Sequence, residues 1–364
     1  MSGPHPDAVA GPVLIVGTGL IGTSVALALR RAGVDVLLSD VDETNLRIAR
    51  EAGAGRRLET DDIPTLVVAA VPPRIVPSVL AKASADYPAA TLTDVASVKE
   101  RVLTEAVRLG ADSSRLVGGH PMAGREVSGS AGARKDLMDD RLWVITPLET
   151  SEGAHVERVQ RLAATCGAVP VQMGLAEHDA AVALVSHAPQ VLSSVLAGQL
   201  ADSRPEFIQI AGQGLRDMTR IAASNVELWA DILEANAPQV AAVLDDLIAS
   251  LIRTRDSLVT SPFDEGDRAV RSVLEAGVAG QSLIPGKHGA APAAFREITV
   301  LLADRPGELG RLFSAVGVAQ VNLEDIRIEH VLGRPSGLVA LYVQPDAATR
   351  LVEALQALNF DVRS

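Results

Sequence analysis

Cysteine, aromatic residues and excess positive charge are all scarce in this chain of 364 residues. A single cysteine, Cys166, excludes an intramolecular disulfide and a zinc site built on several cysteines. Its place in an apolar run predicts a small buried hydrophobe. Lys and Arg number 33 against 45 Asp and Glu, a formal net charge of −12. No nucleic-acid partner is expected, because phosphate neutralisation needs clustered Lys and Arg.

Aromatic residues make up 2% of the chain and apolar residues 48%, so aliphatic side chains must fill the core. The length predicts two or three domains at roughly 150 residues each. Met1–Gly11 lacks the charged-then-apolar pattern of a signal peptide. Ala180–Ala201 has no charged residue, yet it contains His187, Pro189 and Gln190, which are costly in lipid. We interpret it as a helix buried in a soluble cytoplasmic protein, with no membrane partner.

Residues 11–175 alternate short apolar runs with amphipathic stretches, which is typical of an α/β domain with a parallel sheet. The expected strands are Val13–Val16, Val34–Ser39, Leu66–Val71, Thr91–Asp94 and Leu116–Gly118, and Leu142–Thr146 and Val169–Met173 are expected to extend the sheet. The expected crossover helices are Leu20–Ala32, Glu43–Ala52, Pro73–Ala83 and Val98–Leu109.

Residues 176–260 form a second region, whose pattern is helical without strands. Long Ala-, Leu- and Val-rich runs such as Glu227–Leu258 are apolar around much of their circumference. This pattern predicts an all-α domain that packs against itself or a second chain, and therefore favours a homodimer.

The third region follows a segment, 261–294, whose density of Pro and Gly indicates a partly ordered linker. Residues 295–364 are expected to fold as a small ferredoxin-like α+β module, with a possible short last strand at Phe360–Arg363. Its other elements are expected at Arg296–Leu302 (strand), Glu308–Val316 (helix), Leu323–His330 (strand), Leu338–Val343 (strand) and Ala347–Leu358 (helix).

A glycine-rich sequence lies between the first expected strand and helix. Gly17 permits a tight turn, Gly19 permits close approach of a pyrophosphate, and Gly22 permits close helix packing. Asp40 lies 18 residues beyond Gly22, where a carboxylate accepts hydrogen bonds from an adenosine ribose and repels a 2′-phosphate. The pattern predicts an NAD site rather than an NADP site. The residues expected to bind the cofactor are Gly17, Gly19, Leu20, Ile21, Gly22, Asp40, Val71 and Pro72.

Two polar loops follow later strands, at the edge where open α/β sheets bind ligands. His120 stands among glycines, which suits an imidazole exposed to a cleft and acting as acid or base, although a single His is also often structural. Ser97, on the neighbouring loop, is positioned to hold the tautomer of His120 by a hydrogen bond.

The helical region adds two histidines and two arginines. His178 and His187 are nine residues apart, too far for a helical zinc pair, so no metal site is expected. Arg216 and Arg220 are four apart and would share a helix face. They bind a substrate carboxylate or form ion pairs with residues such as Asp217 or Glu126.

Taken together, these motifs resemble the TyrA-type prephenate/arogenate dehydrogenases over nearly the whole chain. The strings that carry the resemblance are GTGLIG, DVASVK, GGHPMAGREVSG, EHD, VSHAPQ and GLRDMTRIAAS. The resemblance implies a Rossmann domain followed by a helical dimerisation domain, and oxidative decarboxylation of prephenate with hydride transfer to NAD+.

The resemblance also implies roles for individual side chains. His120 would accept the hydroxyl proton, oriented by Ser97, and Arg220 would clamp the side-chain carboxylate. The remaining substrate-site residues would be Glu126 and Arg216 as an ionic gate, with His178, His187 and Gln190 lining the site.

Gln190 departs from the imidazole that many relatives carry at that place, which leaves the contact to the substrate side chain open. Arogenate and a 4-amino analogue of prephenate therefore remain alternative substrates. Two further readings stay open, a catalytically idle regulator that senses NAD and amino acids, and a 2-hydroxyacid-type dehydrogenase.

The last region contains the sequences VLLADRPGELG (300–310) and VNLEDI (321–326), and with them it resembles an ACT domain. The resemblance implies binding of tyrosine or a related amino acid, with a purely structural oligomerisation module as the alternative. The implied ligand site comprises Pro306, Gly307, Glu308, Leu309 and Asn322.

Overall fold

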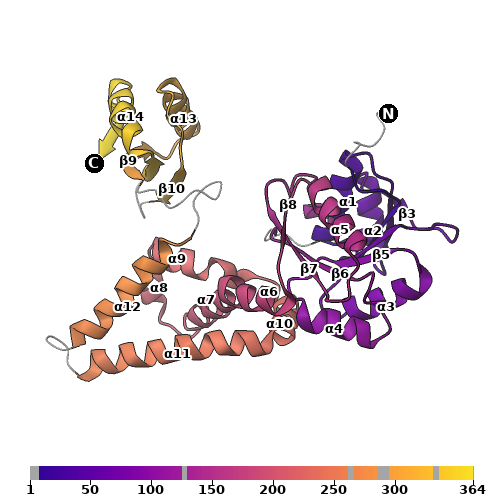
Figure 1. Ribbon diagram of the computed structural model, residues 1–364. Helices are drawn as coiled ribbons and strands as arrows, with labels where there is room; N and C mark the ends of the chain where they lie inside the picture. Colours follow the sequence, from indigo (N-terminus) through magenta and orange to yellow (C-terminus); the bar gives the residue numbers. More distant parts are fainter. Residues whose placement is uncertain (1–7, 125–128, 261–265, 285–294, 331–335, 364) are drawn as a thin grey trace. The chain divides into compact units, whose positions relative to one another are not determined.

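The computed structural model describes residues 8–124, 129–260, 266–284, 295–330 and 336–363 (Figure 1). The chain divides into two compact units, Met1–Leu247 and Ile248–Ser364. The first unit holds the α/β domain and most of the helical region, and the second holds the C-terminal module.

The α/β domain is built on a five-stranded parallel sheet in the order β3-β2-β1-β4-β5. This order, with crossovers on both sides of β1, is that of a Rossmann domain. Its elements in chain order are β1 (Val13–Val16), α1 (Leu20–Arg31), β2 (Val36–Ser39), α2 (Glu43–Glu51), β3 (Arg56–Arg57), β4 (Leu66–Ala69), α3 (Val76–Asp86), β5 (Thr91–Asp94) and α4 (Glu100–Arg108).

Strands β6 (Val117–Pro121), β7 (Leu142–Pro147) and β8 (Val169–Gln172) correct one expectation. They were expected to extend the first sheet, but they form a three-stranded sheet of their own, in which β6 and β7 are antiparallel. A single bridge, Leu92 to Leu116, joins the two sheets. Short apolar runs do not encode strand direction, so the sequence pattern could not reveal this change.

Two apolar layers enclose the sheets, and helices cover both faces (Figure 1). Helices α1, α2 and α5 (Gly153–Thr165) pack in one layer, which also buries Cys166 as predicted. Helices α3 and α4 pack in the other, and Ile232 of the helical region joins it. Burial on both faces explains why these strands are apolar runs rather than alternating ones.

The helical region contains no strand among its described residues, as predicted. It consists of α6 (Leu175–Val182), a π-helical turn (Ala183–His187), α7 (Ala188–Gly198), α8 (Pro205–Gln209), α9 (Gln213–Thr219), a 3-10 turn (Arg220–Ala223), α10 (Val226–Ala235) and α11 (Ala237–Thr260). Arg216 therefore lies on α9, whereas Arg220 opens the 3-10 turn, so the two do not share one regular helix.

Leu175–Gly198 is long and apolar enough to cross a membrane by length and composition. Its buried polar side chains, among them His178, Asp179 and His187, argue instead for a core helix. The expectation of a buried helix is confirmed only in part, because one third of the most apolar 18-residue stretch of Leu175–Gly198 is buried. Leu184, Val185 and Val195 are exposed.

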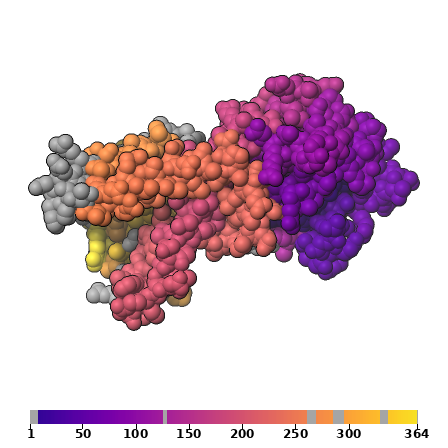
Figure 2. Space-filling model, turned by 90° about the horizontal axis from the view of Figure 1, so that it is seen from below, coloured from indigo at the N-terminus to yellow at the C-terminus, as the bar shows by residue number. Residues whose placement is uncertain are grey.

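The segment from α7 to α9 projects as an arm, drawn in rose in Figure 2. Apolar side chains are exposed along it, including Phe207, Ile210 and Met218. Exposed apolar surface of this kind marks an interaction site.

The second unit contains an unexpected helix, α12 (Gly266–Gln281), within the segment predicted to be a linker. Two glycines inside it, Gly277 and Gly280, weaken a helix without forbidding one. The unit then continues with β9 (Arg296–Ala303), α13 (Glu308–Val318), β10 (Asp325–His330), β11 (Ser336–Val343), α14 (Pro345–Ala357) and β12 (Asp361–Arg363). The βαββαβ order and the sheet β10-β11-β9-β12 agree with the ferredoxin-like module predicted.

Candidate active site

The loop between β1 and α1 has the geometry that a dinucleotide pyrophosphate requires. Gly17 has φ +100°, and a Cβ there would lie 2.3 Å from the Ala70 carbonyl oxygen. A Cβ on Gly22 would lie 2.0 Å from the Gly17 oxygen. Nothing lies within 4 Å of the Cβ position of Gly19, which caps α1. The helix N-terminus thus faces open space, with no acidic residue in its first turn, and fits an anion.

Asp40, directly after β2, lies against this loop. Its carboxylate accepts hydrogen bonds from the Thr18 backbone N–H at 2.5 Å and the Thr18 hydroxyl at 2.7 Å. The Asp42 N–H binds its other oxygen at 2.9 Å. Val71 borders Gly17 from the end of β4, and Pro72 follows it. All the predicted cofactor residues therefore lie at the carboxyl edge of the first sheet, and together they fit NAD.

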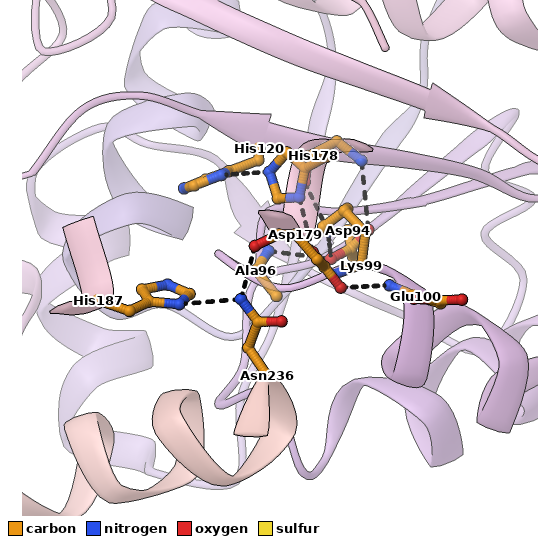
Figure 3. Close-up of polar contacts among 10 residues, drawn as sticks. Asp94, Ala96, Lys99, Glu100, His120, His178, Asp179, His187 and Asn236 are labelled. Carbon is orange, nitrogen blue, oxygen red and sulfur yellow. Dashed lines mark hydrogen bonds and ion pairs between the residues drawn. The ribbon is translucent and has the colours of Figure 1, made fainter. Parts of the chain in front are cut away.

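His120 lies near the end of β6, partly buried, beside α6 of the helical region. Its Nδ1 is 2.8 Å from Nε2 of His178, and the two rings meet edge to face, with centroids 5.1 Å apart (Figure 3). Ser97 makes no hydrogen bond to His120 in the described part of the chain. The predicted Ser97 contact is therefore replaced by His178, since α6 is near the end of β6.

Asp179 continues this chain of contacts and is itself buried. Its Oδ1 is 2.8 Å from His178 Nδ1 and accepts the Lys99 backbone N–H at 2.9 Å. Its Oδ2 accepts the Glu100 N–H at 2.9 Å. The side chain thereby caps α4 from another element and ties the helical region to the α/β domain.

A second branch leads from Asp179 through Asn236 to His187. Asn236 Nδ2 donates to the Asp179 carbonyl at 2.8 Å and to His187 Nδ1 at 3.1 Å (Figure 3). The proton of neutral His187 is therefore on Nε2, which has no hydrogen-bond partner within the described structure. One turn further along, Gln190 Nε2 donates to the Ile221 carbonyl at 3.0 Å. Gln190 thus anchors the 3-10 turn that carries Arg220.

A buried ion pair holds the backbone of the residue that precedes His120. Lys99 Nζ contacts the Asp94 carboxylate and donates to the Gly119 carbonyl at 2.9 Å, and both side chains are 0% exposed. Asp94 Oδ1 accepts the Gly119 N–H at 3.3 Å. Both backbone polar groups of Gly119, the residue before His120, are thus held by one ion pair.

Burial and nearby positive charge shape the protonation of this site. Burial, with His178, Lys99 and His187 nearby, holds the pKa of His120 well below its usual 6.5. Burial lowers the pKa of His187 to about 4. Burial also lowers the pKa of Lys99, although Asp94 opposes that shift. At neutral pH, His120 is a neutral imidazole that can accept a proton.

The structure joins three of the eight residues predicted for catalysis and substrate binding in one network. These three are His120, His178 and His187. Gln190, one helical turn after His187, instead binds the 3-10 turn that carries the exposed Arg220. Glu126 lies outside the described residues, so the predicted gate with Arg216 has no structural description. Sequence reasoning did not assign roles to Asp94, Lys99, Asp179 and Asn236; the first three stand in the motifs quoted above, and nothing local signals Asn236.

Comparison with known proteins agrees with this division. Residues 25–172 match the family profile "Prephenate dehydrogenase, nucleotide-binding domain", and residues 175–269 match "Prephenate dehydrogenase, dimerization domain". The chain is 34% identical over 358 residues to a probable prephenate dehydrogenase, NovF, of Streptomyces niveus, covering 96% of this chain and 99% of that one. It is 27% identical to the prephenate dehydrogenase of Bacillus subtilis, covering 92% of each.

Among solved structures, the chain resembles prephenate dehydrogenase from A. aeolicus in complex with hydroxyphenyl propionate and NAD+. The TM-score is 0.67 at 28% identity, over 74% of this chain and 97% of that one. About a quarter of this chain therefore has no counterpart in that structure. With a nucleotide-binding fold, a helical region and a histidine at their junction, the chain belongs to the prephenate dehydrogenase family.

Proposed function

We propose that the protein is a cytoplasmic NAD+-dependent prephenate dehydrogenase, which converts prephenate to 4-hydroxyphenylpyruvate and CO2 in tyrosine biosynthesis. Membership of the family supports the reaction, and the open N-terminus of α1 above Gly19 supports the cofactor. The single observation that carries the chemistry is a neutral His120 at the junction of the α/β domain and the helical region.

His120 acts as the base in this proposal. Bound NAD+ supplies the hydride acceptor. As the ring carbon that bears the hydroxyl is oxidised, His120 accepts the hydroxyl proton. The ring carboxylate then departs as CO2, the electrons of the broken bond enter the ring, and His120 returns the proton to the phenolate oxygen that results. Aromatisation drives the reaction, so the protein must supply orientation and one base. The backbone of Gly119 is held by the Lys99–Asp94 pair, and the imidazole is held by His178.

Arg220 is the proposed clamp for the side-chain carboxylate of the substrate. It is carried by the 3-10 turn that Gln190 anchors, so its position is coupled to α7 and thereby to His187. A guanidinium recognises a carboxylate through two parallel hydrogen bonds. Arg216, Glu126, His178, His187 and Gln190 complete the proposed substrate site, and Asp40 belongs to the proposed cofactor site.

A direct assay tests the proposal against its alternatives. We expect kcat/KM to be highest for prephenate with NAD+, and at least about tenfold lower with NADP+, because Asp40 repels a 2′-phosphate. A higher kcat/KM for arogenate, or for the 4-amino analogue, would reassign the substrate. Absence of turnover on all three would favour the NAD-sensing regulator, and turnover of a 2-hydroxyacid would favour that dehydrogenase class.

The C-terminal module is proposed to be an ACT domain that binds tyrosine or a related amino acid. Gly307 has φ +93° and caps α13, whose first turn contains Glu308 and Leu309. The backbone N–H groups at this helix start, with Pro306 before it and Asn322 as a further ligand, suit an amino-acid carboxylate, because the charge of Glu308 is paired with Arg311 at 2.9 Å. Calorimetric titration of the full chain with tyrosine is expected to show saturable binding that Asn322→Ala weakens. If Asn322→Ala binds tyrosine as the parent does, the proposed ligand site is wrong. If no aromatic amino acid gives a heat of binding, the module is better explained as a structural oligomerisation module.

A further inference from the structure

Beyond the base itself, we propose that Asp179 is a positioning residue that sets the tautomer of His120 through His178. The inference rests on the proposed function for its catalytic meaning. It concerns three side chains in series, Asp179, His178 and His120, joined by two contacts of 2.8 Å (Figure 3).

The first step is that Asp179 only accepts hydrogen bonds. Two backbone N–H groups, those of Lys99 and Glu100, donate to its two oxygens. Both donors lie at the N-terminus of α4, whose dipole favours a negative charge. A carboxylate held in this way has no proton to give. The 2.8 Å contact to His178 therefore requires the proton on His178 Nδ1.

The second step takes His178 as a neutral imidazole, which has one N–H and one lone pair. With its proton on Nδ1, His178 presents a lone pair at Nε2. The 2.8 Å contact there requires His120 to donate from its Nδ1. His120 then has its lone pair on Nε2, which makes no contact with His178, and this nitrogen is the base.

The same series stabilises the charge that develops during reaction. When His120 Nε2 takes up the hydroxyl proton, the new positive charge is hydrogen-bonded to His178, which in turn is hydrogen-bonded to the buried anion of Asp179. Interactions among groups withdrawn from water are stronger than in bulk solvent. Removing the charge of Asp179 should therefore slow the chemical step and spare substrate binding.

The experiment compares Asp179→Asn with His178→Gln, whose side-chain oxygen can still accept from His120 Nδ1. Nitrogen-15 NMR of the substrate-free protein, labelled on histidine, reports which nitrogen of His120 carries the proton. We expect a lone pair on Nε2 in the parent protein and a shifted tautomer in Asp179→Asn. We expect kcat to fall about 10²–10⁴-fold in Asp179→Asn, with smaller loss in His178→Gln, and KM little changed.

A proton on Nε2 of His120 in the parent protein would overturn the inference. This NMR measurement uses the parent protein alone, so it does not depend on whether the variants fold. An Asp179→Asn protein that melts at a lower temperature but keeps the parent kcat and histidine spectrum would also overturn the inference, because Asp179 would then only cap α4. If the spectra agree with the assignment but the parent protein does not turn over prephenate, the proposed function fails and the tautomer assignment stands.

Discussion

Three glycines at the start of α1 differ in what a side chain would meet there. At Gly17 and Gly22 a Cβ would collide with backbone atoms, so those glycines are required by the fold. At Gly19 a Cβ would meet nothing within 4 Å. The fold therefore does not require a glycine at position 19. Gly19 is explained by the ligand, because a side chain there would project into the open space at the N-terminus of α1.

Gly19→Ala is expected to leave the melting temperature within a few degrees of the parent value and to weaken NAD+ binding by at least about tenfold, since the methyl group occupies space needed by the pyrophosphate. Fluorescence titration with NADH measures this. Gly153→Ala, at the equally open first position of α5, is the matched control and should bind normally. Equal affinities in the two variants would remove the cofactor from this loop.

His187 links stability to pH. Its pKa is about 4 in the folded chain against an ordinary 6.5, so the unfolded state binds more protons between these values. The contribution of neutral His187 to the free energy of unfolding is fully present above pH 6.5 and is lost as the pH falls towards 4. At pH 5 we expect the free energy of unfolding to be about 2 kcal/mol lower than at pH 8 from this group alone. His187→Gln should reduce the pH dependence by that amount in urea titrations, whereas an unchanged pH dependence would mean that His187 is not buried as a neutral ring.

At the scale of elements, local pattern predicted strand and helix positions well and contacts between elements poorly. The buried runs Val13–Val16 and Thr91–Asp94 are strands with those bounds, because burial on both faces leaves an unbroken apolar signature. The antiparallel pairing of β6 with β7 and the helix α12 were missed. The partner of His120 was also missed, since 58 residues separate it from His178 and no local spacing encodes their contact.

The buried pair of Asp94 and Lys99 joins β5 to β6 and is expected to be sensitive to loss of one partner. Lys99→Met leaves an unpaired carboxylate in a fully buried place, at a cost of about 3–5 kcal/mol of unfolding free energy. Adding Asp94→Asn should restore a large part of that loss, because no buried charge remains. Denaturant unfolding of the two variants measures this; a double variant no more stable than Lys99→Met would show that the charge itself is not the cause.

At the scale of the whole molecule, the exposed apolar arm of α7 to α9 is the strongest indication of a homodimer. Exposure of Phe207, Ile208 and Ile210 together at the end of α8 is costly in water unless another chain covers them. Residues 175–269 match a profile described as a dimerization domain, which supports the same assignment.

Ile210→Asp is expected to weaken self-association by about 10- to 100-fold, since burying an isoleucine stabilises an interface by about 1.5–3 kcal/mol. Sedimentation equilibrium over a range of protein concentrations measures the dissociation constant. Ile63→Asp is the matched control, because Ile63 is 77% exposed on the α/β domain and Ile210 83%. An equal effect in both variants, or none in either, would place the dimer interface elsewhere.

The pH profile of kcat/KM for prephenate, measured for the parent protein and for His120→Asn, tests the central claim most directly. With a neutral His120 as base, the parent rate should fall only on the acid side, at a pH well below 6.5, because burial and His178 lower the pKa of His120. His120→Asn should lose about 10²–10⁴-fold in kcat and the acid-side fall together, and bind NAD+ normally. A variant that keeps near-parent turnover, or the same acid-side fall, would contradict the account.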